Sequence, residues 1–129
     1  MQQVIRVRIT NISGRTVEGI KVIAEQFKNF GEVSIPGTPL RISHDLGNLK
    51  AAGFPINPGD KEFVDCVETK PGSGELYLCH ALGGGPLIVT RDKELVLKVL
   101  VTAFGTPRQE TELQISVDES GVVHCKATS

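Results

Sequence analysis

Short runs of alternating apolar and polar residues, separated by turn residues, limit most strongly how this chain can fold. Ile5, Val7 and Ile9 alternate with polar residues near the start, and residues 95–103 repeat the alternation over a longer run. A period of two is typical of a strand with one buried face, because successive side chains point to opposite faces of a sheet. With Gly, Pro, Asn and Asp clusters between the runs, the pattern predicts an all-β fold, an antiparallel two-sheet β-sandwich of about 7–9 strands.

The expected strands lie at residues 5–10, 17–27, 40–44, 61–69, 75–81, 95–103, 110–117 and 122–126. We expect the first two to form an antiparallel hairpin, and the fourth and fifth to form another around a loop of about five residues. The run at 95–103 is apolar on both faces near its middle, which predicts a central strand.

Other segments are expected to be irregular. A helix over residues 17–28 is the alternative to the second strand, but its β-branched residues and Gly19 favour a strand. Residues 48–53 predict a helical turn, and residues 28–39 and 83–93 predict loops that a partner could contact.

Composition bounds the class of protein. The chain has 129 residues and a net charge of -1, with 40% hydrophobic residues, so we expect one sandwich domain over residues 1–129 that needs no cofactor to be stable. The balanced charge argues against a nucleic-acid partner. No apolar run approaches the length of a membrane span, so membrane insertion is not expected. The first residues lack the features of a signal peptide, which predicts a cytoplasmic location.

Three segments carry a resemblance to a known group of domains. Residues 5–14 followed by 17–22 resemble the opening of bacterial immunoglobulin-like and fibronectin-III-like sandwiches, where an extended strand meets an Asn-x-x-Gly turn. Residues 56–60 look like their Pro-Gly edge turn, and residues 97–105 look like their late central strand. The chain is similar in particular to uncharacterised bacterial domains, some from phage or mobile-element neighbourhoods. The resemblance implies an immunoglobulin-like sandwich that serves as a non-catalytic interaction or spacer module.

Five side chains form the main chemical candidate. Cys66, Cys79, His80, His124 and Cys125 are residue types that bind zinc. Neighbouring strand residues point to opposite faces, so at most one of each Cys/His pair could reach a shared metal. We therefore expect no metal site and no catalytic residue, with the thiols packing as small apolar groups. A disulfide between Cys66 and Cys79 is the alternative that the second hairpin would permit, although a reducing compartment favours thiols.

The remaining motifs have simpler interpretations. Gly83, Gly84 and Gly85 precede a proline instead of a helix, which is typical of a loop and not of a phosphate site. Residues 118–121 predict a turn in preference to a calcium loop. Arg6 and Arg8 are expected to lie on a solvated strand face.

The leading functional prediction is a non-catalytic protein-interaction or scaffolding module with a protein partner. One alternative is a structural subunit of a phage or mobile-element assembly, forming a homo-oligomer through its edge strands. The other is a small metal-dependent or cysteine-based enzyme that uses the five Cys/His residues.

Overall fold

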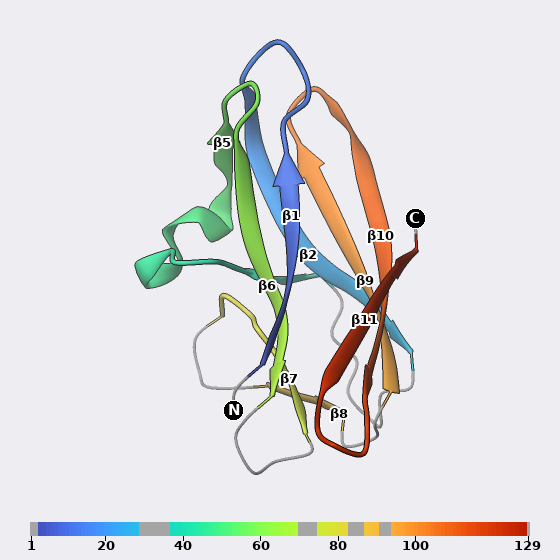
Figure 1. Ribbon diagram of the computed structural model, residues 1–129. Helices are drawn as coiled ribbons and strands as arrows, with labels where there is room; N and C mark the ends of the chain where they lie inside the picture. The colour runs from blue at the N-terminus through green and yellow to red at the C-terminus, as the bar shows by residue number, and fades with distance from the viewer. Residues whose placement is uncertain (1–2, 29–36, 70–74, 83–86, 91–93, 129) are drawn as a thin grey trace.

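The chain folds into two antiparallel β-sheets that pack face to face (Figure 1), which confirms the predicted all-β sandwich. The structure is a computed structural model that describes residues 3–28, 37–69, 75–82, 87–90 and 94–128. The first sheet contains β1 (Val4–Thr10), β6 (Lys61–Thr69), β7 (Leu76–Leu78) and β8 (Leu87–Thr90) in that order, with β4 (Arg41–Ile42) also pairing with β6. The second sheet has the order β11 (Val123–Thr128), β10 (Thr106–Val117), β9 (Glu94–Ala103), β2 (Val17–Lys28) and β3 (Thr38–Pro39), with β5 (Phe54–Ile56) also pairing with β2.

These five- and six-stranded sheets contain more strands than the expected number of about 7–9. Besides β8, which lies in an expected loop, the strands that were not predicted are β3 and β5, with only two and three residues. Segments this short carry no periodic pattern, so the sequence does not reveal them.

β9 is central to the six-stranded sheet, as predicted, and pairs with β10 on one side and with β2 on the other. Its inward side chains Leu95, Leu97 and Val99 are almost fully buried and belong to the core shared by both sheets. Burial of each such side chain contributes about 1.5–3 kcal/mol, so β9 accounts for a large part of the apolar stabilisation.

The predicted hairpin between residues 5–10 and 17–27 is wrong. Both segments are strands, but β1 pairs with β6 and β2 pairs with β9 in the other sheet. Residues 11–16 therefore connect the two sheets instead of closing a hairpin. Turn residues determine where the chain reverses direction. They do not determine which sheet the next strand joins, because this depends on where the apolar faces meet.

The chain crosses between the sheets a second time at Leu40, within the predicted strand 40–44. β3 pairs with β2 in one sheet and β4 pairs with β6 in the other. Leu40 is buried at the crossing, and the strand ends before His44, which is exposed and has a φ of 64°. Of the predicted strand over 40–44, only Arg41 and Ile42 form a strand, β4, and the preceding β3 belongs to the other sheet.

Two further predicted boundaries change. The loop expected over 28–39 includes Lys28, which ends β2, and all of β3. The loop expected over 83–93 includes β8, because the β-branched residues Ile88 and Val89, next to the apolar Leu87, favour a strand. Residues 29–36, 83–86 and 91–93 of these loops lie outside the described residues.

Several local predictions are confirmed. β6 and β7 form the second hairpin, and β10 and β11 pair across the turn at 118–121. The predicted helical turn is the 3₁₀ segment η1 (Leu46–Ala52), which is interrupted where Gly47 and Asn48 have positive φ. Within the described part of the chain, no helix has the length and hydropathy needed to cross a bilayer.

A buried carboxylate joins three strands of the first sheet. Asp65 lies in β6 opposite Arg6 of β1 on one edge and Arg41 of β4 on the other. Arg6 Nε donates to Asp65 Oδ1 at 2.6 Å, and Arg41 Nε donates to Oδ2 at 3.0 Å. The Ser43 hydroxyl also donates to Oδ1, at 2.6 Å. Arg6 therefore does more than face solvent, because it satisfies a carboxylate that is only 4% exposed.

These contacts determine the protonation state of Asp65. Burial alone would raise the pKa of this carboxyl group, but the hydrogen bonds from Ser43, Arg6 and Arg41 and the charge of Arg41 outweigh burial and leave the pKa lowered. The ionised form is thus favoured in the folded protein. A lowered folded-state pKa means that the group stabilises the fold above its ordinary pKa and loses this effect as the pH falls through the folded value.

We predict that Asp65→Asn lowers the free energy of unfolding at neutral pH by about 2 kcal/mol, because charged hydrogen bonds are replaced by weaker ones. The difference from the wild type should shrink below about pH 4, as the pH falls from the ordinary carboxyl value through the lowered folded-state pKa of Asp65. Urea denaturation at both pH values measures this. Asp60→Asn, at an exposed position, is the control, and a deficit that stays constant with pH would contradict the assignment.

Candidate functional site

The three cysteines lie in two environments. Cys66 in β6 and Cys79, just after β7, are both buried, whereas Cys125 in β11 is exposed, and all three are thiols. The backbone N–H of Cys79 donates to the carbonyl of Cys66 at 2.9 Å, so the hairpin does place these residues opposite each other. The structure joins them by the backbone and not by a disulfide.

The candidate histidines His80 and His124 each contact nearby polar groups. His80 forms a β-bridge with Leu40, and its Nδ1 accepts a hydrogen bond from the N–H of Leu82 at 3.1 Å. His124 contacts Asp118 at the other end of the turn that joins β10 to β11, with 2.8 Å between Nε2 and Oδ2. In the part of the chain that the structure describes, no three His, Cys, Asp or Glu side chains form a group that could hold a metal ion. The five predicted candidates are therefore not brought together.

The thiols of Cys66 and Cys125 are not activated as nucleophiles. Burial raises the pKa of Cys66 well above its usual range, and the neighbouring Cys79, Cys125 and Asp65 raise it further. Partial burial also raises the pKa of Cys125. Catalytic cysteines need a lowered pKa, because the thiolate is the reactive form. The raised pKa values of Cys66 and Cys125 therefore disfavour the thiolate form that cysteine catalysis needs.

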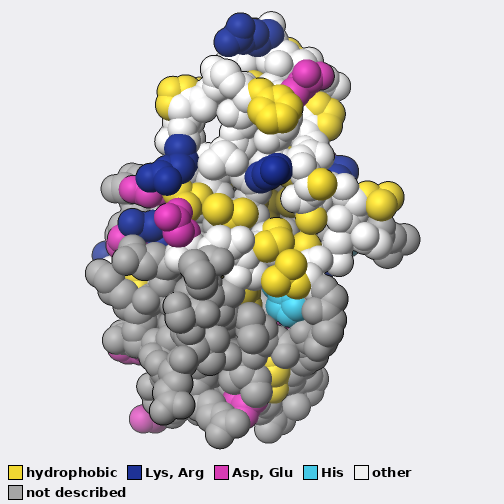
Figure 2. All heavy atoms as spheres, turned by 180° about the vertical axis from the view of Figure 1, so that it is seen from behind, with side chains coloured by type: hydrophobic (Ala, Val, Ile, Leu, Met, Phe, Trp, Pro, Cys, Tyr) yellow, Lys and Arg dark blue, Asp and Glu magenta, His cyan; other side chains and the backbone are white. Residues whose placement is uncertain are grey.

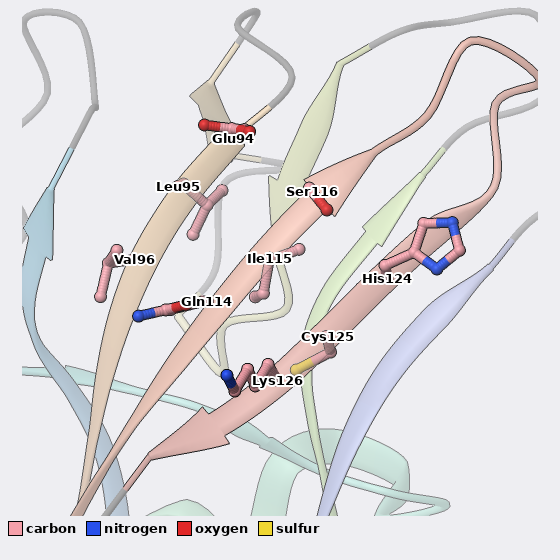
Figure 3. A pocket seen from close by; sticks show the side chains of 9 residues that line it. All are labelled: Glu94, Leu95, Val96, Gln114, Ile115, Ser116, His124, Cys125 and Lys126. Carbon is pink, nitrogen blue, oxygen red and sulfur yellow. The ribbon is translucent and has the colours of Figure 1, made fainter.

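A shallow groove of about 300 Å³ contains His124 and Cys125 (Figure 3). It lies along β9, β10 and β11, where Ser116 pairs with His124 and Gln114 pairs with Lys126. Its lining is mostly polar. In Figure 3 the His124 ring and the Cys125 side chain leave β11 on different sides, as expected for neighbours in a strand.

Ser116, His124 and Asp118 have the residue types of a hydrolase triad on a single hairpin. The His124 and Asp118 side chains are 60% and 41% exposed, so water screens their interaction. The hydrogen bond from His124, with those from the N–H groups of Val122 and Ser120, lowers the pKa of Asp118. Ser116 lies opposite His124 in the ladder, but no hydrogen bond joins their side chains in the described structure. These contacts stabilise the turn and do not form a nucleophile and base.

Three turns form a hydrogen-bonded surface at one end of the sandwich. We call this surface the turn end and define it as residues 11–16, 57–60 and 104–105. These three turns meet at the top of Figure 1. Asn11, which is buried, holds two of them together. Its Nδ2 donates to the carbonyls of Arg15 and Ile56 at 2.8 Å each, and its Oδ1 accepts from the N–H of Ser13 at 2.9 Å. Backbone bonds join Asn11 to Gly59 and Asp60 as well.

The turn end exposes two large apolar side chains. Ile12 is 96% exposed and Phe104 is 75% exposed. The backbone N–H of Phe104 donates to the carbonyl of Glu18 at 2.9 Å, and its ring lies against Gly19, where an added Cβ would come within 2.6 Å of the ring. Figure 2 shows hydrophobic side chains among charged ones at this end of the back face.

An apolar cavity of about 130 Å³ opens beside these turns. Its apolar lining comes from both sheets, including Ile9, Val17, Ile20, Ile56 and Val101. Thr10, Thr106 and Gln109 add polar groups to the lining. A cavity of this size accommodates one apolar side chain, but not a cofactor.

Only weak sequence signals mark the turn end. Asn11 and Ile12 have the sequence neighbours of turn residues. A buried asparagine that joins several segments cannot be distinguished from an ordinary turn asparagine by its neighbours alone. Phe104 between a strand and Gly105 was the stronger signal, because a large aromatic residue in a tight turn is unusual.

We predict that Asn11→Ala lowers the free energy of unfolding by about 2–3 kcal/mol, because it removes several hydrogen bonds and leaves the carbonyl of Ile56 without its side-chain donor. Chemical denaturation measures the loss. Asn57→Ala is the matched control, since Asn57 is exposed and its side chain accepts a single hydrogen bond, from Thr16, within the described structure. Equal effects of the two substitutions would show that Asn11 does not organise the turns.

We also predict that one thiol of three reacts quickly with an aromatic disulfide reagent in the native protein. Cys125 is exposed, whereas Cys66 and Cys79 are buried and should react only after unfolding. Counting the released thiolate before and after adding denaturant measures this. Cys125→Ser should abolish the fast phase, and a fast phase that persists would contradict the placement of the cysteines.

Comparison with known proteins leaves the function to be argued from this geometry. The sequence has no significant match to a protein-family model or to a curated protein, and the structure has no significant match to a solved structure.

Proposed function

We propose that the chain is a non-catalytic protein-interaction module that binds its partner through the turn end. The observation that carries this proposal is the exposure of Ile12 and Phe104 beside an apolar cavity, on turns that are held by the hydrogen bonds of Asn11 and by the backbone bond from Phe104 to Glu18. Exposed apolar groups on a rigid support are typical of binding surfaces.

The rigidity of the turns supports this use of the surface. Binding by a mobile loop loses conformational entropy, whereas turns held by hydrogen bonds lose little. Asn11 bonds within its own turn and to residues 56–60, and the backbone of Phe104 is fixed to Glu18. The apolar side chains are thus presented in one arrangement, and an apolar partner side chain of matching size would fill the cavity.

The other expectations are weighed against the same geometry. The enzyme alternative receives no support from the described Cys and His side chains, which form no group that could hold a metal ion, while the pKa values of Cys66 and Cys125 are raised. A structural subunit of a phage or mobile-element assembly is the second candidate, and the open edge of β11 favours it. An immunoglobulin-like relationship, a bacterial source and a cytoplasmic location stay predictions, and a protein partner fits the near-neutral charge better than nucleic acid.

The turn end is tested by charge insertion. Ile12→Asp and Phe104→Asp should each lose partner proteins that the wild type retains from a lysate, because a charge in a desolvated apolar contact typically weakens binding about tenfold or more. Leu49→Asp is the matched control, since Leu49 is 80% exposed but lies on η1. Quantitative mass spectrometry of the captured proteins measures the difference. The same set captured by all four proteins would refute the proposal.

A further inference from the structure

β11 ends the six-stranded sheet and has an open edge. It pairs with β10 along one side, and the N–H of Asp118 donates to the carbonyl of Val122 where the two strands meet. Hydrogen-bonded and non-hydrogen-bonded pairs alternate along an antiparallel ladder. From this bond onward, the even-numbered residues of β11 bond to β10, and the odd-numbered residues turn their N–H and carbonyl groups to the open edge. Those residues are Val123, Cys125 and Ala127.

Only the start of this edge is covered within the described structure. Oε1 of Gln3 accepts from the N–H of Val123 at 2.9 Å, and its Nε2 donates to the carbonyl of Gly121 at 2.6 Å. The edge groups of Cys125 and Ala127 have no hydrogen-bond partner among the residues that the structure describes. They are free to pair with another strand.

The open edge of β11 is less protected than that of β1, which ends the other sheet. β1 carries Arg6 and Arg8 and faces a register shift in β6, two features that hinder edge pairing. β11 has Lys126 as its one charged residue other than a histidine and runs in regular register along β10. A partner strand would therefore add to β11.

The residues of β11 fit a second copy of the same strand. In an antiparallel pair with a two-fold axis at Cys125, each Cys125 faces its counterpart, and Val123 of one copy faces Ala127 of the other. Every residue on this face is small and apolar, so the copies approach without a clash. On the opposite face, Lys126 of one copy comes beside His124 of the other, whose ring already contacts Asp118 at 2.8 Å. The Asp118 carboxylate offsets the charge of the incoming ammonium group.

We propose that two copies of this chain associate by antiparallel pairing of β11, with the two-fold axis at Cys125, and so continue the six-stranded sheet across the interface. Cys125 donates to and accepts from its counterpart, and the N–H of Ala127 donates to the carbonyl of Val123 in the other copy. A single strand pair buries little surface, so the association is weak and depends on protein concentration. The proposal is independent of the turn end.

Sedimentation analysis over a range of protein concentrations tests the association. The wild type should form a dimer whose dissociation constant rises about tenfold or more in Ala127→Pro, because proline removes the edge donor without removing a bond to β10. Arg8→Pro is the matched control: it places proline in β1, an edge strand of the other sheet, and should leave the dimer unchanged. Ile12→Asp should also leave it unchanged, which separates this test from that of the turn end.

Disulfide trapping tests the register. With diamide, which oxidises two thiols and takes up their hydrogens, Cys125 should form a covalent dimer that Cys125→Ser abolishes. In the Cys125→Ser background, Val123→Cys mixed with Ala127→Cys should give a mixed disulfide, whereas Val123→Cys alone should give little.

Three outcomes overturn the proposal. The first is a monomer at every concentration with no disulfide trapped through Cys125. The second is a dimer that Ala127→Pro, verified as folded by circular dichroism, does not weaken. The third is a trapping pattern in which Val123→Cys pairs with itself as readily as with Ala127→Cys, which would indicate a different register or a strand of another protein as the natural occupant.

Discussion

Asp65 is the residue on which the arrangement of the first sheet depends. Its carboxylate is nearly inaccessible to water, and a buried charge is tolerated only when its lone pairs are filled. The donors come from β1 on one side and from β4 and the segment after it on the other. Two strands that are distant in the sequence are thus fixed to the same position of β6. The short β4, which could not persist alone, is held beside β6 by this ion pair as well as by its ladder.

This constraint explains why the chain changes sheets where it does. Leu40 follows β3 and precedes Arg41, and its burial between the sheets allows the chain to cross without exposing apolar surface. Arg41 then forms an ion pair with Asp65, and Ser43 adds a third hydrogen-bond donor to those of Arg6 and Arg41. The crossing at residues 11–16 follows a similar logic, because Asn11 supplies the polar contacts that the backbone needs where it leaves one sheet for the other.

The sequence predicted the strands well because alternation is a local property. The central position of β9 followed from its two apolar faces, and the β6–β7 hairpin followed from a short loop with Gly and Pro. Strand pairing is not local: nothing near Val4–Thr10 shows that β6 is its neighbour, since residues 11–60 lie between the two strands. The candidate site was harder still. The Cys and His residues are conspicuous by type but form no metal-holding group among the described residues, whereas Asn11 acquires its role only when distant turns meet around it.

The turn end and the edge of β11 lie on different parts of the sandwich, and their combination has a physical consequence. Pairing through β11 leaves residues 11–16 and 104–105 outside the interface, so a dimer carries two turn ends on one rigid, continued sheet. A partner with repeated sites that match this spacing would bind the second turn end at a high effective concentration, and the overall affinity would exceed that of either end without any new contact. Weak self-association through one short strand is sufficient for this gain, because a multivalent partner itself stabilises the dimer by mass action.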